Sequence, residues 1–130
     1  MHVRAPGSPI SVELPDEWIQ PYCFTSEAGQ TAYASTSRED WPTRLVSIAS
    51  VAPPVRAPGV VTLHEERARS ILRAMAERTP LPPIEVTRSP DRTDGKLTVR
   101  DGFHRYYLSL AVGFSALPVS ERPFIDLNAL

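Results

Sequence analysis

The chain has 130 residues, 14 of them lysine or arginine and 15 aspartate or glutamate, so its formal net charge is −1. This near-neutral balance argues against a protein that coats nucleic acid through bulk charge, and a single cysteine excludes a disulfide framework or a cysteine-rich zinc site. No apolar run reaches the roughly 20 residues of a membrane helix. We therefore expect one soluble, cytoplasmic domain over 1–130, with no bound metal and no membrane partner.

The first 58 residues contain eight of the 14 prolines, and they predict short strands rather than long helices. Alternating apolar residues predict a strand over 10–14, and the apolar run over 45–51 predicts another. Shorter strands are candidates over 22–24 and 31–34. The prolines between 53 and 58 indicate an extended approach to the first helix.

The clearest predicted helix spans 62–78. Thr62 and Glu65 have the spacing of a capping box, with Thr62 as the N-cap and Glu65 at the third helical position. Apolar residues then repeat at helical spacing, which predicts that one face is buried. This face consists of Leu63, Ala68, Ile71, Leu72 and Met75.

Two alternating segments, 83–87 and 96–100, predict a hairpin with a long loop. The Asp101-Gly102 pair that follows is typical of a tight hairpin turn, but the apolar spacing beyond it favours a helix over 103–112 that ends at Gly113. The residues with this spacing are Phe103, Tyr107, Leu110, Ala111 and Phe114. A last strand is predicted over 116–120, so the fold class is α+β, with a small mixed sheet and two main helices.

The start of the 103–112 helix is the candidate functional site. Free backbone N–H groups at a helix N-terminus bind anions, and Gly102 allows the tight turn that leads into the helix. His104 and Arg105 lie in the first turn, where a positive charge opposes the helix dipole. A bound phosphate would explain them. In the alternative, His104 is neutral and Arg105 pairs with Asp101.

Three segments, in order and spacing, resemble the ParB/sulfiredoxin-like superfamily: 81–86 (Leu-Pro-Pro-Ile-Glu-Val), 97–107 and 113–119. The resemblance covers about 45–122 and leaves 1–44 as an N-terminal, strand-rich extension of unknown role. It implies a nucleotide, ATP or CTP with Mg²⁺, whose phosphates are held at the glycine-led helix start. The residues implied in binding are Gly102, Phe103, His104 and Arg105, with Arg67 and Ser70 on the preceding helix.

Two departures from the superfamily pattern narrow the range of functions that we expect. Phe103 replaces the sulfiredoxin cysteine, so the chain is not expected to be a sulfiredoxin. The helix-turn-helix that follows this core in ParB proteins is also missing, so we expect a stand-alone core of the ParB-like nuclease type.

Two functions remain open. In the first, a nucleotide- or phosphate-binding domain hydrolyses or transfers phosphate, as an ATPase, kinase or nuclease, with His104, Arg105 and Asp101 as catalytic residues. In the second, a non-catalytic protein-interaction or DNA-associated regulatory module keeps only the scaffold. The expected partners are a nucleotide or other phosphorylated ligand, nucleic acid and a second copy of the chain.

Overall fold

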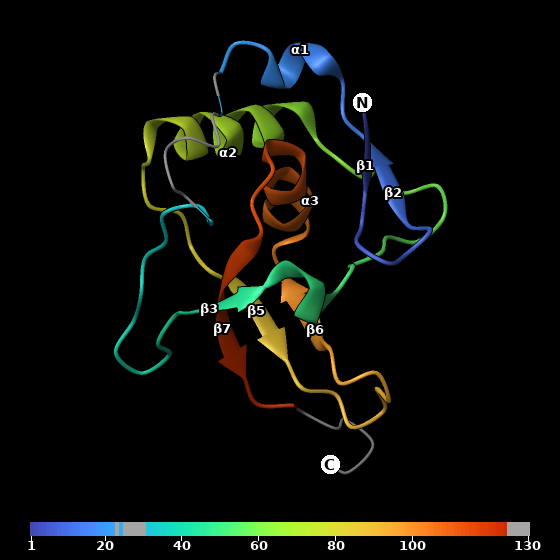
Figure 1. Ribbon diagram of the computed structural model, residues 1–130, viewed down its shortest axis with the longest axis vertical. Coiled ribbons are helices and arrows are strands. Elements are labelled where there is room, and N and C mark those ends of the chain that lie inside the picture. Colours follow the sequence, from blue (N-terminus) through green and yellow to red (C-terminus); the bar gives the residue numbers. More distant parts are fainter. Residues whose placement is uncertain (23, 25–30, 125–130) are drawn as a thin grey trace.

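The computed structural model describes residues 1–22, 24 and 31–124, and its architecture is α+β, as the sequence predicts. In Figure 1 the helices gather in the upper half of the molecule and the main sheet in the lower half. Within the described residues this sheet has five strands in the order β3-β7-β5-β6-β4, and β4–β6 and β5–β7 are its parallel pairs. The strands are β3 (Arg44–Ser47), β4 (Val51–Ala52), β5 (Ile84–Thr87), β6 (Leu97–Asp101) and β7 (Ala116–Arg122).

Residues 1–22 cover the helical side of the molecule. Strands β1 (His2–Arg4) and β2 (Ser11–Glu13) form a separate antiparallel pair that contacts α3 (Phe103–Val112), which confirms the strand expected over 10–14. The short helix α1 (Asp16–Ile19) packs on α2 (Glu65–Glu77). Its buried Trp18 donates a hydrogen bond from Nε1 to Glu65 Oε1 at 3.0 Å. Within residues 1–22, β1 and α1 therefore pack against the helices α3 and α2.

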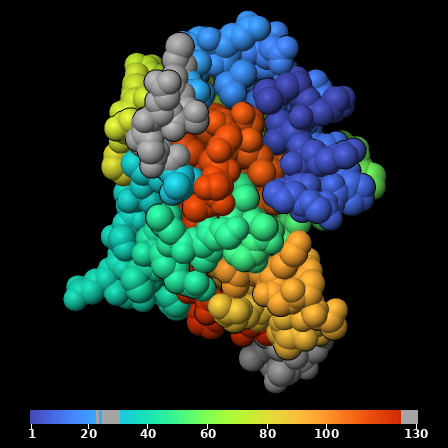
Figure 2. All heavy atoms as spheres, viewed as in Figure 1, coloured from blue at the N-terminus to red at the C-terminus, as the bar shows by residue number. Residues whose placement is uncertain are grey.

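The segment from residue 31 to β3 runs down the left side of the molecule in Figure 2, where it is teal. The strand expected over 31–34 is wrong, because this segment makes only an isolated bridge between Ser35 and Leu81. The backbone N–H of Leu81 donates to Ala34 O, and the buried Tyr33 hydroxyl donates to Pro82 O at 2.8 Å. The strand expected over 22–24 lies partly outside the described residues.

The apolar run 45–51 is not one strand. It divides into β3, a 3₁₀ turn over Ile48–Ser50 and β4, and β3 and β4 form opposite edges of the sheet. The Ser47 hydroxyl accepts a hydrogen bond from the Ala49 N–H at 3.4 Å and caps the turn. The predicted single strand is therefore corrected to two short edge strands joined by a turn.

Helix α2 confirms the predicted apolar face, since Ala68, Ile71, Leu72 and Met75 are buried. Its N-terminus differs from the prediction, because His64 rather than Thr62 is the N-cap residue and no side chain within the described ranges caps it. The His64 N–H instead donates to the His104 ring, and the Glu65 carboxylate accepts from Trp18. Tertiary partners thus replace both halves of the predicted capping box.

The hairpin of β5 and β6, the helix α3, its glycine C-cap Gly113 and strand β7 agree with the sequence prediction. The buried face of α3 is wider than predicted, because every residue from His104 to Ser109 is buried. Tyr106 and Leu108, outside the predicted apolar spacing, have no exposed surface. Contacts of α3 with α2 and β1, and its place in the same buried core cluster as the sheet residues, explain this breadth. In the described part of the chain, no helix is long and apolar enough to cross a membrane.

Candidate functional site

The turn from β6 into α3 requires glycine. Gly102 is buried and has φ 128°, and a Cβ at this position would lie 2.9 Å from Ile84 Cγ1. Its carbonyl accepts the first helical hydrogen bond, from the Tyr106 N–H at 2.8 Å. Among the residues that the structure describes, no side chain caps the N–H groups that precede Tyr106. The turn therefore presents uncapped backbone donors.

A cavity of about 290 Å³ opens at this helix start, and we call it the α3 pocket. It is lined by 54–56, Arg67, Ile71 and 99–105. Because these residues come from the proline-rich segment, α2, β6 and α3, the pocket depends on the folded arrangement of elements far apart in sequence.

Three arginines bring positive charge to the α3 pocket: Arg56, Arg67 and Arg100. Within the described residues, none of them has a carboxylate within 4 Å, whereas Arg69 and Arg73 on α2 pair with glutamates. The Arg56 guanidinium lies over the Phe103 ring, 4.4 Å from its centroid. Its Nε is buried and has no hydrogen-bond partner among those residues. The pocket is thus basic although the whole chain is nearly neutral.

His104 is buried, with 3% of its surface exposed, and its Nε2 accepts the His64 N–H at 2.9 Å. Burial is the main cause that lowers the pKa of His104 to about 4, and the nearby Arg67, Arg56 and His64 contribute to the same shift. The imidazole is therefore neutral at pH 7, with its proton on Nδ1, as that hydrogen bond requires. It satisfies a backbone donor at the start of α2.

Arg105 is also buried and its guanidinium is engaged. One terminal nitrogen donates to the carbonyls of Pro82 and Pro83 at 2.8 and 2.7 Å, and the other lies 3.5 Å from Asp101 Oδ2. This is the arrangement of the sequence alternative, in which Arg105 pairs with Asp101 and His104 is neutral. The side chain ties the entrance of β5 to the start of α3.

A larger hollow of about 640 Å³, the α2 groove, adjoins the α3 pocket and shares Arg67, Ile71, Asp101 and Arg105 with it. Ser70 lines this groove beside Arg67, so the two α2 residues expected to share one side do so. All the expected site residues therefore line the α3 pocket or the α2 groove.

Sequence reasoning missed Arg56, which lines the α3 pocket. Arg56 lies in an extended segment with no periodicity, and its placement depends on a long-range contact, the hydrogen bond of 2.7 Å from the Tyr107 hydroxyl to Pro54 O. In the part of the chain that the structure describes, no three His, Cys, Asp or Glu side chains gather as a metal site needs.

Comparison with known proteins supports the fold. No protein-family model and no curated protein sequence matches the chain. A solved structure that matches is the C-terminally truncated chromosome-partitioning protein ParB from Caulobacter crescentus, complexed with CTP-γ-S, at 26% sequence identity and a TM-score of 0.50. The chain has a ParB-like fold. The match covers 65% of this chain and 46% of the ParB chain, so this ParB-like chain corresponds to less than half of that protein.

Proposed function

We propose that the chain binds a nucleotide, with its phosphates in the α3 pocket. The observation that carries the proposal is the convergence of three arginines, without carboxylate partners among the described residues, on an uncapped helix N-terminus. Both features favour a multiply charged anion. Within the described part of the chain, the Arg56 Nε is a buried donor without a hydrogen-bond partner, which costs desolvation free energy. A phosphate oxygen that accepts from this N–H would offset that cost.

The proposed contacts assign a role to each side of the pocket. The backbone donors of Gly102, Phe103 and His104 and the guanidinium groups of Arg56 and Arg67 hold the phosphates. Ser70 supplies a hydroxyl from the adjoining α2 groove, which has room for the rest of a nucleotide. His104 and Arg105 act as positioning residues, because their polar atoms hold the backbone at His64, Pro82 and Pro83.

CTP and ATP are the candidate nucleotides, and the ParB of similar fold, complexed with CTP-γ-S, supports CTP as the first to test. Mg²⁺ would enter with the phosphates, since it binds mainly through phosphate oxygens, water and one or two carboxylates. Asp101 is the exposed carboxylate that lines both hollows, so it would hold Mg²⁺ through one of the waters bound to the ion, and its own oxygens would stay free of direct coordination.

Hydrolysis or transfer of phosphate depends on the same carboxylate. Of the three residues expected to be catalytic, Asp101 is the one with a largely exposed side chain, whereas His104 is buried with its Nε2 bound to the backbone and the Arg105 guanidinium binds two carbonyls and Asp101. We therefore assign general-base work, in an ATPase, kinase or nuclease reaction, to Asp101. Without that reaction the chain is a nucleotide-binding module.

Calorimetric titration with CTP, ATP, ADP and inorganic phosphate, each with Mg²⁺, tests binding. We expect Arg67→Ala to weaken nucleotide binding at least about tenfold, because a hydrogen bond to a charged group contributes roughly 1.5–3 kcal/mol. Arg73→Ala is the matched control, since Arg73 is exposed on the same helix and pairs with Glu77. The proposal fails if the wild type binds none of these ligands, or if both variants weaken binding equally.

Nucleic acid is tested with the same proteins. Incubation with single- and double-stranded DNA and Mg²⁺ measures cleavage, which Asp101→Asn must abolish if the nuclease reading is correct. Cleavage that survives in this variant would contradict the assignment of the base.

A further inference from the structure

On the far side of the Arg105–Asp101 pair lies another hollow, of about 300 Å³, which we call the Trp41 pocket. Its walls come from the 36–41 segment, the start of β5 and the end of β7, with Asp101 and Arg105 at the boundary with the α2 groove. Its charged lining residues are Arg38, Glu85, Asp101, Arg105 and Arg122. The pocket thus adds to the ParB-like core a wall from a segment before β3.

The charges of the Trp41 pocket are paired, unlike those of the α3 pocket. Arg122 Nε donates to Glu85 Oε1 at 3.0 Å, and Arg38 lies 3.3 Å from Asp40. The Arg122 guanidinium also lies over the Trp41 ring, 4.3 Å from its centroid. The Trp41 face is therefore occupied by a cation and is not a platform for a base. Because its arginines are matched by carboxylates, the pocket suits a ligand that carries both a positive and a negative group.

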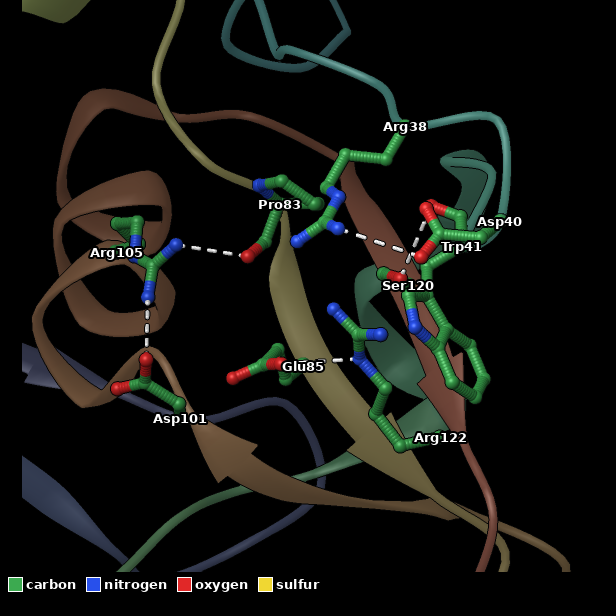
Figure 3. A network of polar contacts seen from close by, with 9 residues as sticks. All are labelled: Arg38, Asp40, Trp41, Pro83, Glu85, Asp101, Arg105, Ser120 and Arg122. Atoms are coloured by element: carbon green, nitrogen blue, oxygen red, sulfur yellow. Dashed lines mark hydrogen bonds and ion pairs between the residues drawn. The ribbon is translucent and has the colours of Figure 1, made fainter.

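After this pairing, some arginine nitrogens and some carboxylate oxygens remain without a hydrogen-bond partner among the residues described. They lie at different places in the pocket. Figure 3 shows the guanidinium groups of Arg38 and Arg122 pointing toward one another, near Trp41. One oxygen of the Glu85 carboxylate accepts from Arg122, and the other oxygen points away from Arg122, on the side of Asp101. Within the described residues, the terminal nitrogens of Arg122 and the second oxygens of Glu85 and Asp101 have no hydrogen-bond partner. One end of the pocket thus offers donors, and the other offers acceptors.

We infer that the Trp41 pocket binds a small zwitterion. Its anionic group lies between Arg38 and Arg122, and its cationic group faces Glu85 and Asp101. The volume of the pocket accommodates a molecule of amino-acid size, and charge-assisted hydrogen bonds at both ends select against a ligand with only one charge. This site is additional to the nucleotide site, and the two meet at Asp101 and Arg105.

Calorimetry with zwitterions of increasing charge separation tests the inference. The probes are glycine, β-alanine, γ-aminobutyrate, ε-aminocaproate and the common L-α-amino acids, and propionate and propylamine are the singly charged controls. We expect at least one zwitterion to bind at about 10 mM or below and the singly charged controls to bind at least about tenfold more weakly. The inference is overturned if no zwitterion binds, or if a singly charged control binds as tightly.

Two variants locate the binding. Arg38→Ala removes an exposed side chain whose loss does not disturb the core, and Glu85→Gln keeps the shape of its side chain. Each should weaken zwitterion binding about tenfold. Arg44→Ala is the matched control, because Arg44 is an exposed arginine of β3 that pairs with Glu121 outside the pocket. Equal binding by Arg38→Ala and the wild type would place the zwitterion elsewhere and overturn the inference.

The two sites can fail separately. Arg38→Ala should bind nucleotide as the wild type does, because Arg38 lines neither the α3 pocket nor the α2 groove. Zwitterion binding without nucleotide binding would refute the proposed function and support the Trp41 pocket. Nucleotide binding without zwitterion binding would support the proposed function and refute the zwitterion site in the Trp41 pocket.

Discussion

Acidification should destabilise the protein through His104. In the folded chain its pKa is about 4, against an ordinary value of 6.5, because the ring is buried and lies near Arg67 and Arg56. The unfolded chain therefore takes up the proton first as the pH falls. The stabilisation from the neutral ring is complete above about pH 6.5 and is lost progressively down to about pH 4.

The size of the effect follows from the shift. One pKa unit corresponds to about 1.4 kcal/mol, so the full shift is about 3 kcal/mol in the free energy of unfolding. This is a large fraction of the roughly 5–15 kcal/mol that stabilises a typical domain. His104 alone should therefore account for a measurable part of acid denaturation.

Urea unfolding between pH 4 and pH 8, followed by tryptophan fluorescence, measures this effect, since Trp18 is buried in the fold. His104→Gln is the comparison, because glutamine does not titrate and its amide oxygen can accept the His64 N–H. Carboxylates affect both proteins alike, so the difference between wild type and variant isolates His104. If that difference stays constant over the whole pH range, the buried, neutral histidine is refuted.

Three substitutions test the frame of the site by thermal denaturation and nucleotide titration. Gly102→Ala should cost at least about 2 kcal/mol, because φ is positive there and the new Cβ would meet Ile84 at 2.9 Å; an unchanged melting temperature would contradict the required glycine. Tyr107→Phe removes the hydrogen bond to Pro54 O and should cost about 1 kcal/mol and weaken nucleotide binding, while unchanged affinity would show that this anchor does not position the neighbouring arginine. Arg105→Lys should cost about 2 kcal/mol, because an ammonium cannot reproduce the planar contacts to two carbonyls and a carboxylate; full stability in the lysine variant would refute the positioning role.

The second half of the fold could be predicted from sequence because its signals are local. Apolar spacing and Gly113 define α3 and its end, and alternation defines the β5–β6 hairpin. The run 45–51 carries the same apolar signal throughout, although it serves two opposite edges of one sheet. Pairing partners far away in sequence decide such a division, and no local pattern contains them.

The candidate site likewise has features that the local sequence predicts and features that depend on distant residues. The glycine turn follows from the local sequence, whereas Arg67 and Ser70 were expected from the family resemblance, and only their shared side follows from helix geometry. The capping box failed because His104 and Trp18, which are distant in sequence, bind the groups at the start of α2 that the local pattern would have paired. Arg56 was missed because it lies in an extended, proline-rich segment. Such a segment has no periodicity from which the direction of a side chain can be deduced.

The position of β3 at a sheet edge has a consequence for the order of folding. β3 pairs with β7 at a separation of about 70 residues, whereas β5 and β6 are joined by the much shorter connection 88–96. Because closing the longer loop costs more entropy, we expect the hairpin and the Gly102 turn to form before β3 docks. The 36–41 segment directly precedes β3, so the Trp41 wall should be completed last. A folding intermediate with β3 detached would already contain the helix start that faces the phosphates, while lacking the second pocket.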